Sequence, residues 1–168
     1  MCSTISIASA VTDPPTTTTT EPATTTTAAP KTVEDEVAAA WVQSIDDFYA
    51  ASADPAMADS ILRRSRSGDS LGATSAAIAS LEQAGRHVAY PSGRPEVSVA
   101  EVTAQDAAAS LTGCVIDRSV VVEGSGEVVD DDITSTRYLA VMRLVDGTWF
   151  VVSEGTQRQW TDDEGCDR

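Results

Sequence analysis

The stretch that decides the fold is residues 134–156, which read TSTRYLAVMRLVDGTWFVVSEGT. Two runs rich in β-branched and aromatic residues flank Asp146-Gly147, a pair that strongly favours the two-residue turn of a β-hairpin. We therefore predict two antiparallel strands, 134–145 and 148–156, joined by a type I′ turn.

A two-residue turn also determines which residues face each other, because side chains alternate between the two sides of a strand. The expected cross-strand pairs are Leu144 with Trp149, Met142 with Val151, and Ala140 with Ser153. Together with Tyr138 they make one side of the hairpin apolar, so that side should be buried. The opposite side carries Arg137, Arg143 and Glu154 and should be wetter.

Shorter runs with a period of two residues precede this hairpin. The expected strands are 86–90, 96–102, 107–117 and 120–123. The segment PSGRP at 91–95 is rich in turn-forming residues and separates the first two. We expect residues 86–156 to form one continuous antiparallel sheet.

Residues 31–85 carry helical signals instead. Thr32 and Asp35 form a capping-box pattern, after which apolar residues recur at helical spacing. The expected helices run from 32 to about 52, from 54 to Gly68, and from 69 to Gly85. This order predicts an α+β fold in which three N-terminal helices pack on a curved antiparallel sheet of four to six strands.

Residues 1–30 differ from the rest of the chain because they hold eleven Thr, four Pro and no Lys or Arg. Such a composition cannot bury enough apolar area to offset the entropy of ordering. We predict a disordered Thr/Pro-rich tether over 1–30 and a single α+β domain over 31–168. The net charge of the whole chain is −15, which opposes binding to nucleic acid.

The first ten residues, MCSTISIASA, suggest a remnant of an export signal. Cys2 could be the lipid-modified cysteine of a bacterial lipoprotein, which would anchor the chain to a membrane. Alternatively, Ala8-Ser9-Ala10 could be the cleavage site of an ordinary secreted protein, or Cys2 could be an incidental residue of a cytosolic one. We expect an extracytoplasmic protein, either attached to the cell envelope or secreted.

Two further cysteines fit that location. Cys114 lies in a predicted strand, and Cys166 follows the acidic stretch TDDEG near the end of the sequence. A Cys114–Cys166 disulfide would tie this stretch back to the sheet, and an oxidising compartment permits such a bond. The sequence holds one His and no CxxC motif, so we expect neither a metal nor a cofactor.

The order of these elements resembles the nuclear transport factor 2-like superfamily, in particular short extracytoplasmic members found in actinobacterial lipoproteins. The resemblance is carried by VAAAWVQSIDDFYAA, SLEQAGRH, LTGCVID, RYLAVMRLVDGTWFVVS and the final EGC. It implies a cone-shaped domain, in which a curved sheet wraps against helices and encloses a pocket. Domains with this fold include isomerases, dehydratases, ligand carriers and protein-interaction modules, so the fold does not determine the function.

Candidate functional residues follow from this arrangement. The expected pocket lining consists of Trp41, Ile45, Tyr138, Met142 and Trp149. Were the pocket catalytic, Tyr138 would be the proton donor and Asp46 or Asp47 the acid, although solvated carboxylates and a core tyrosine are the plainer interpretation.

Other polar groups have equally plain interpretations. Those considered are His87, the arginines Arg63, Arg64 and Arg66, and the run Asp130-Asp131-Asp132. We interpret them as a surface histidine, a solvated helix end and an acidic turn. The alternatives are a catalytic histidine, an anion site and a cation site.

The function expected from the sequence is that of a non-catalytic cell-envelope domain. It would bind either a small apolar ligand or another envelope protein. The alternatives are a small pocket enzyme of the isomerase or dehydratase type, and a purely structural secreted domain.

Overall fold

Helix α1 (Val33–Ala53) begins the part of the chain that the computed structural model describes, which is residues 31–167. Its start confirms the predicted capping box. The Asp35 backbone N–H donates to Thr32 Oγ1 (3.1 Å), and the Thr32 backbone N–H donates to Asp35 Oδ2 (3.0 Å). Val37, Trp41 and Ile45 follow one another at four-residue spacing and are all buried, so one stripe of α1 faces the core.

The single helix predicted over residues 54–68 is wrong, because the chain breaks into shorter pieces there. The elements are the 3₁₀ turn η1 (Pro55–Met57), helix α2 (Ala58–Leu62) and helix α3 (Gly68–Gln83). Between α2 and α3 the backbone on either side of Arg66 bonds to a strand. The Ser67 N–H donates to the Val151 carbonyl (3.0 Å), and the Val151 N–H donates to the Ser65 carbonyl (2.9 Å). Hydrogen bonds to the open edge of the sheet thus replace a further helical turn.

The strands form two antiparallel sheets. They are β1 (Arg86–Ala89), β2 (Glu96–Gln105), β3 (Ala108–Asp117), β4 (Val120–Glu123), β5 (Val128–Asp130), β6 (Thr134–Val145) and β7 (Thr148–Trp160). One sheet has the order β1-β4-β5 and the other β2-β3-β6-β7.

The prediction of one continuous sheet is therefore wrong. The Ser119 N–H donates to Asp117 Oδ1 (2.8 Å), and this turn ends β3 and redirects the chain into β4. Strand β4 then pairs with β1 instead of extending the four-stranded sheet. The coarser prediction of an α+β fold with three helices and antiparallel strands is confirmed for residues 31–167.

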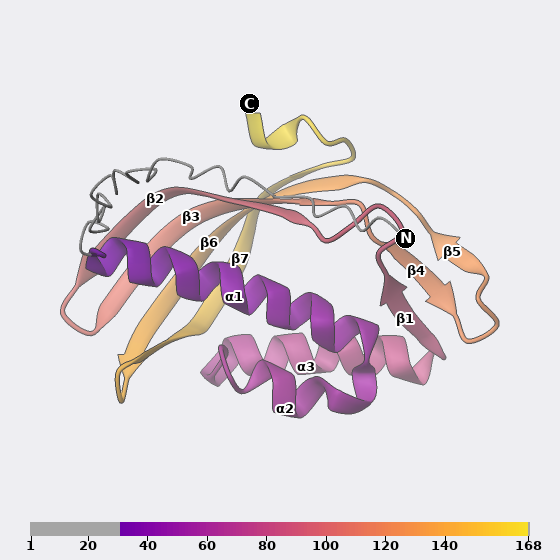
Figure 1. The fold of residues 1–168 in the computed structure, drawn as a ribbon, viewed down its shortest axis with the longest axis horizontal. Helices are drawn as coiled ribbons and strands as arrows, with labels where there is room; N and C mark the ends of the chain where they lie inside the picture. Colours follow the sequence, from indigo (N-terminus) through magenta and orange to yellow (C-terminus); the bar gives the residue numbers. More distant parts are fainter. Residues whose placement is uncertain (1–30, 168) are drawn as a thin grey trace, which may run out of the picture. The chain divides into compact units, whose positions relative to one another are not determined.

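All three helices lie on one side of the curved four-stranded sheet (Figure 1). The main core lies between that face and α1, and Trp41 is its largest fully buried side chain. Trp41 packs directly under Gly113 of β3, where a Cβ atom would come within 2.3 Å of the indole ring. The sheet and α1 approach each other this closely because position 113 has no side chain.

The β6–β7 hairpin confirms the predicted turn, and only part of the predicted register. Asp146 and Gly147 both have positive φ angles, 49° and 80°, as a type I′ turn requires. Leu144 faces Trp149 and Met142 faces Val151, as expected, whereas Ala140 faces Glu154 and not Ser153. The pairing shifts by one residue at Val152, which forms a β-bulge.

The bulge reverses the predicted sides of the residues that follow it in β7, Ser153 and Glu154 among them. Beyond an extra residue, side chains that should point outward point inward. Glu154, expected on the wetter side of the hairpin, instead lies on the side that the helices cover.

The predicted disulfide is present, with Cys114 and Cys166 joined and their Cα atoms 5.8 Å apart. Cys114 alternates with the inward-facing Gly113 and Val115, so it points to the outer face of the sheet. The bond holds the last element, the 3₁₀ turn η2 (Gly165–Asp167), against that face, on the side away from the helices (Figure 1). Arg137 of β6 stacks on Trp160 at this covered end, with its guanidinium carbon 5.6 Å from the ring centre.

Substitution of Gly113 by Ala is predicted to destabilise the domain by about 2 kcal/mol, because the new methyl group overpacks against Trp41. Gly155→Ala is the matched control, since that glycine also lies in a strand and a Cβ there meets nothing within 4 Å. Urea unfolding of both variants tests this, and equal midpoints would contradict the tight approach of α1 to β3.

Removal of the disulfide by Cys166→Ser is predicted to lower the free energy of unfolding. The bond closes a loop with a sequence separation of 52 residues, which the chain-entropy model converts to about 4 kcal/mol as an upper value. Thermal unfolding compared with and without reductant checks the loss. Intact-mass analysis that finds free thiols at Cys114 and Cys166 in exported, unreduced protein would contradict the bond.

Candidate functional site

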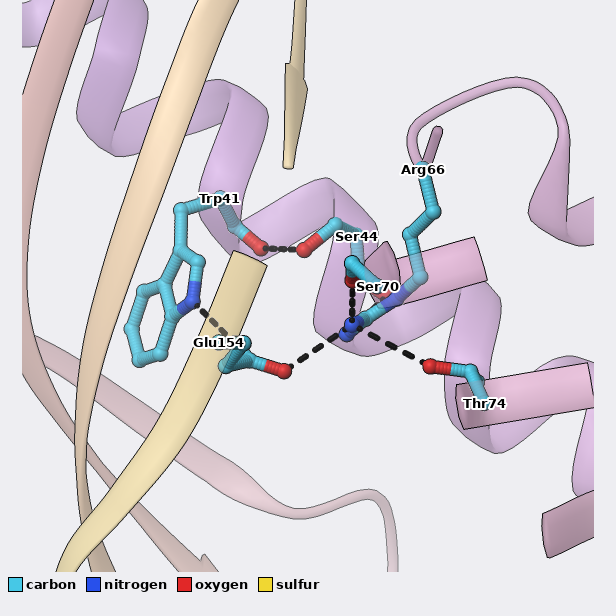
Figure 2. Close-up of polar contacts among 6 residues, drawn as sticks. All are labelled: Trp41, Ser44, Arg66, Ser70, Thr74 and Glu154. Atoms are coloured by element: carbon cyan, nitrogen blue, oxygen red, sulfur yellow. Dashed lines mark hydrogen bonds and ion pairs between the residues drawn. The ribbon is translucent and has the colours of Figure 1, made fainter. Parts of the chain in front are cut away.

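Glu154 and Arg66 form a buried ion pair between the helices and the four-stranded sheet (Figure 2). Glu154 Oε2 lies 2.9 Å from Arg66 Nη1, and the exposed fractions of the two side chains are 13% and 3%. The other carboxylate oxygen, Oε1, accepts a hydrogen bond from Trp41 Nε1 at 2.7 Å. The Glu154 carboxylate therefore joins α1, the segment before α3 and β7 at one point.

The arginine is held on its other side by the two long helices. Nη1 also lies 2.9 Å from Ser70 Oγ and 3.5 Å from Thr74 Oγ1, both on α3. Nη2 donates to the Ser44 carbonyl of α1 at 3.3 Å. The backbone of Arg66 is fixed as well, because its neighbours Ser65 and Ser67 bond to Val151, three residues before Glu154. Both charged side chains are thus positioned from the same strand.

The Nε atom of Arg66 is buried and has no hydrogen-bond partner among the described residues. The guanidinium instead lies near the Phe48 ring, with its central carbon 6.0 Å from the ring centre. Such a contact offsets part of the cost of an unsatisfied donor.

A cavity of about 80 Å³ adjoins this ion pair. Its apolar and aromatic lining comes from Ile45, Phe48, Tyr49, Val115 and Tyr138, and its polar lining from Arg66, Thr74 and Glu154. The volume is well below the roughly 300–1,000 Å³ of pockets that enclose drug-sized ligands. The cavity can hold a few waters, a small molecule, or one end of a larger molecule.

The tyrosines around the cavity are held in their neutral form. Burial raises the pKa of Tyr49, and the nearby Asp117 carboxylate raises it further. Burial also raises the pKa of Tyr138, with the Glu154 charge as the second cause. The Tyr49 hydroxyl donates to Asp117 Oδ2 at 2.7 Å, so its proton is already engaged.

The residues predicted to line a pocket lie in the core, and the structure separates them into two groups. Ile45 and Tyr138 line the cavity. Trp41, Met142 and Trp149 are buried in the packed core beside it, and Trp41 reaches the site only through its bond to Glu154.

Neither candidate acid lines the cavity with Tyr138. Asp47 is buried, and it accepts hydrogen bonds from Ser65 Oγ (2.6 Å) and Gln43 Nε2 (3.1 Å). Asp46 is partly exposed and lies 3.7 Å from Arg94. These carboxylates fasten α1 to neighbouring segments.

The three arginines and the histidine considered as site residues differ in their exposure and position. Arg63 is exposed and pairs with Asp59 at 2.8 Å, and Arg64 is exposed too, as expected of a solvated helix end. The same expectation is wrong for Arg66, which is 3% exposed. His87 lies in β1 opposite Val122, away from the cavity.

Within residues 31–167 no cluster of His, Cys, Asp or Glu has the arrangement of a metal site. In the acidic run, the Asp132 N–H donates to Asp130 Oδ1 (3.1 Å), which is a local turn contact. Cys2, the candidate lipid attachment site, lies outside the described residues.

Sequence reasoning missed the Arg66–Glu154 pair because both residues were assigned to solvent. The only local signal is the unbroken apolar run Trp149-Phe150-Val151-Val152, in which strict alternation is lost. That run permits a bulge and does not say where the extra residue sits.

Replacement of Glu154 by Gln is predicted to destabilise the domain by about 3 kcal/mol, because it leaves the Arg66 charge buried without a counter-charge. The matched control is Asp59→Asn, which removes one partner of the exposed Arg63–Asp59 pair and should leave stability unchanged. Chemical denaturation measures both. Equal, small effects would show that the Arg66–Glu154 pair is solvated.

Comparison with known proteins gives a fold and no family. No protein-family model matches the sequence, and no curated protein matches it. Among solved structures, the intermembrane space region of the chloroplast protein ARC6 aligns with a TM-score of 0.62 at 12% identity, covering 76% of this chain and 98% of that one. A ketosteroid isomerase-like protein from Erwinia carotovora atroseptica aligns with a TM-score of 0.50 at 12% identity, covering 73% and 93%. The chain therefore shares a fold with these two domains, and the likeness extends over most of its described part.

Proposed function

We propose that this protein is a non-catalytic binding domain of the cell envelope, and that the cavity beside Arg66 receives a small, largely apolar molecule. The observation that supports this most is the state of three carboxylates, of which Glu154 lines the cavity whereas Asp47 and Asp117 do not. Each of Glu154, Asp47 and Asp117 already accepts two hydrogen bonds from the protein.

A general base must be able to accept a proton in the course of a reaction. A proton on Glu154 would disrupt its contact with the buried Arg66 cation, and that contact holds three elements together. The only side-chain carboxylate within hydrogen-bond reach of a cavity tyrosine is Asp117, among the hydrogen bonds of residues 31–167. Asp117 itself lines a different pocket, which also contains Ser119 and Asp130. This separation favours binding over the alternative of an isomerase or dehydratase.

The proposed location outside the cytoplasm rests on two observations, the disulfide and the composition of the first thirty residues. A bond between Cys114 and Cys166 persists in oxidising compartments. None of the helices in residues 31–167 is long and apolar enough to cross a bilayer. We propose that a lipid on Cys2, within the Thr/Pro-rich tether over 1–30, attaches the chain to a membrane.

The nature of the ligand follows from the lining. Five of the eight lining residues are aliphatic or aromatic, and the charges of Arg66 and Glu154 cancel. An apolar group is therefore better suited to the cavity than an anion, which would gain little from an arginine already paired.

Titration with benzene as the apolar probe and acetate as the anionic probe tests this proposal. Benzene is expected to shift the methyl resonances of Ile45 and Val115, and acetate is expected to leave them unchanged. Val115→Ile adds one methylene to the cavity lining, which reduces the cavity volume and should weaken benzene binding several-fold. Val129→Ile, on the distant strand β5, is the matched control and should leave benzene binding unchanged. Binding of acetate in preference to benzene, or no shift with either probe, would contradict the proposed ligand site.

A further inference from the structure

One hydrogen-bond donor of the residues that line the cavity is left unused by the protein. Arg66 lines the cavity and is 3% exposed, and its guanidinium has three donor nitrogens. Nη1 contacts Ser70, Thr74 and Glu154 (Figure 2), and Nη2 donates to the Ser44 carbonyl. Nε is buried and has no hydrogen-bond partner within the described part of the chain.

The guanidinium borders the space that a ligand would occupy. The Phe48 ring centre lies 6.0 Å from the central guanidinium carbon, and Phe48 and Arg66 line the same cavity. A buried donor without an acceptor costs free energy, and the face of an aromatic ring offsets only part of that cost. An acceptor that enters the cavity would therefore gain a charge-assisted hydrogen bond that the protein alone does not make.

The charges around Arg66 favour a neutral acceptor. Glu154 Oε2 lies 2.9 Å from Nη1 of the same guanidinium, so an anion at Nε would be held beside a buried negative charge. Residues 31–168 carry 24 acidic and 11 basic side chains, which opposes an anion further. A group that only donates would gain nothing at Nε, because arginine has no acceptor. The oxygen of an ether, an ester or a ketone meets both conditions.

We infer that the ligand of this cavity is an ether, ester or ketone whose oxygen accepts a hydrogen bond from Arg66 Nε. The inference rests on the proposed function, because it names the class of molecule bound at the same site. The cavity volume of about 80 Å³ limits the part that enters to a small ring or a short chain end. The ligand is thus held at one polar atom, and its remaining atoms pack against the apolar lining.

Tetrahydrofuran and cyclopentane are a matched pair of probes, because an ether oxygen replaces one methylene of the same five-membered ring. In a cavity without a donor, tetrahydrofuran would bind about tenfold more weakly than cyclopentane, since its oxygen loses its hydrogen bonds to water. We expect the full chain to bind tetrahydrofuran at least as tightly as cyclopentane. The methyl resonances of Ile45 and Val115 give both dissociation constants.

A second readout reports on the donor itself. In proton–nitrogen correlation spectra, the Nε–H resonance of Arg66 should move when tetrahydrofuran binds and should move less when cyclopentane binds. This measurement uses the wild-type chain, so it tests the inference even where a variant fails to fold.

Arg66→Lys keeps a cation that can pair with Glu154 and removes the Nε donor. Once circular dichroism has shown that this variant is folded, it should still bind cyclopentane and should bind tetrahydrofuran about tenfold more weakly than cyclopentane. Arg63→Lys is the matched control, because Arg63 is exposed and pairs with Asp59 at the surface. It should leave both affinities unchanged.

The results separate this inference from the proposed function. Weaker binding of tetrahydrofuran than of cyclopentane to the wild type would overturn the inference and leave an apolar ligand in place. So would an Nε–H resonance that bound tetrahydrofuran does not move, or loss of the tetrahydrofuran preference in Thr74→Val or Tyr138→Phe, which remove other hydroxyls from the lining. Failure of tetrahydrofuran, cyclopentane and benzene to bind would overturn the proposed function and the inference together.

Discussion

The ion pair between Arg66 and Glu154 is the contact on which the arrangement of helices and sheet depends. It brings together α1 through Trp41 and Ser44, α3 through Ser70 and Thr74, and β7 through Glu154 itself. Burying two charges is costly, and their attraction compensates only when further hydrogen bonds satisfy both groups. Here the carboxylate and both terminal nitrogens of the guanidinium make hydrogen bonds to the protein, so the ion pair holds the three elements together in one arrangement.

Two backbone features make this ion pair possible. The residues around Arg66 pair with Val151 at the edge of β7, and the bulge at Val152 turns Glu154 inward a few residues later. Gly113 adds a third condition, because a side chain at this position would occupy the space of the Trp41 ring, which lies against β3 and also reaches Glu154. The small cavity is the space left beside these contacts, which explains why its polar side is already occupied by protein groups.

Much of the fold could be predicted from local patterns. The capping box at Thr32, the Asp146-Gly147 turn and the Cys114–Cys166 bond each depend on residues whose chemistry has one main structural use. The cross-strand register of the hairpin was predictable only as far as Met142 and Val151, because alternation carries a register until an extra residue interrupts it. Arg66 was assigned to solvent for a related reason. A third arginine after α2 looks like the other two, and only its bridge to β7 makes it different.

The division into two sheets could not be read from the sequence either. Strands 107–117 and 120–123 are separated by two residues, and no local pattern shows that the second pairs with β1. The polar side of the cavity depends on another non-local pairing, that of the segment around Arg66 with β7, whereas its apolar side follows from the periodicity of α1 and β6. This is why sequence analysis found Ile45 and Tyr138 and missed their charged neighbours.

The bulge at Val152 has a consequence for comparing this chain with its relatives. In an alignment, a gap of one residue in β7 would count as a single difference, smaller than several substitutions. Physically it would exchange the two sides of every later residue in the strand and carry Glu154 out of the core. Two chains of high sequence identity that differ by that gap would have different interiors. Two chains of low identity that share the extra residue can keep the same buried ion pair.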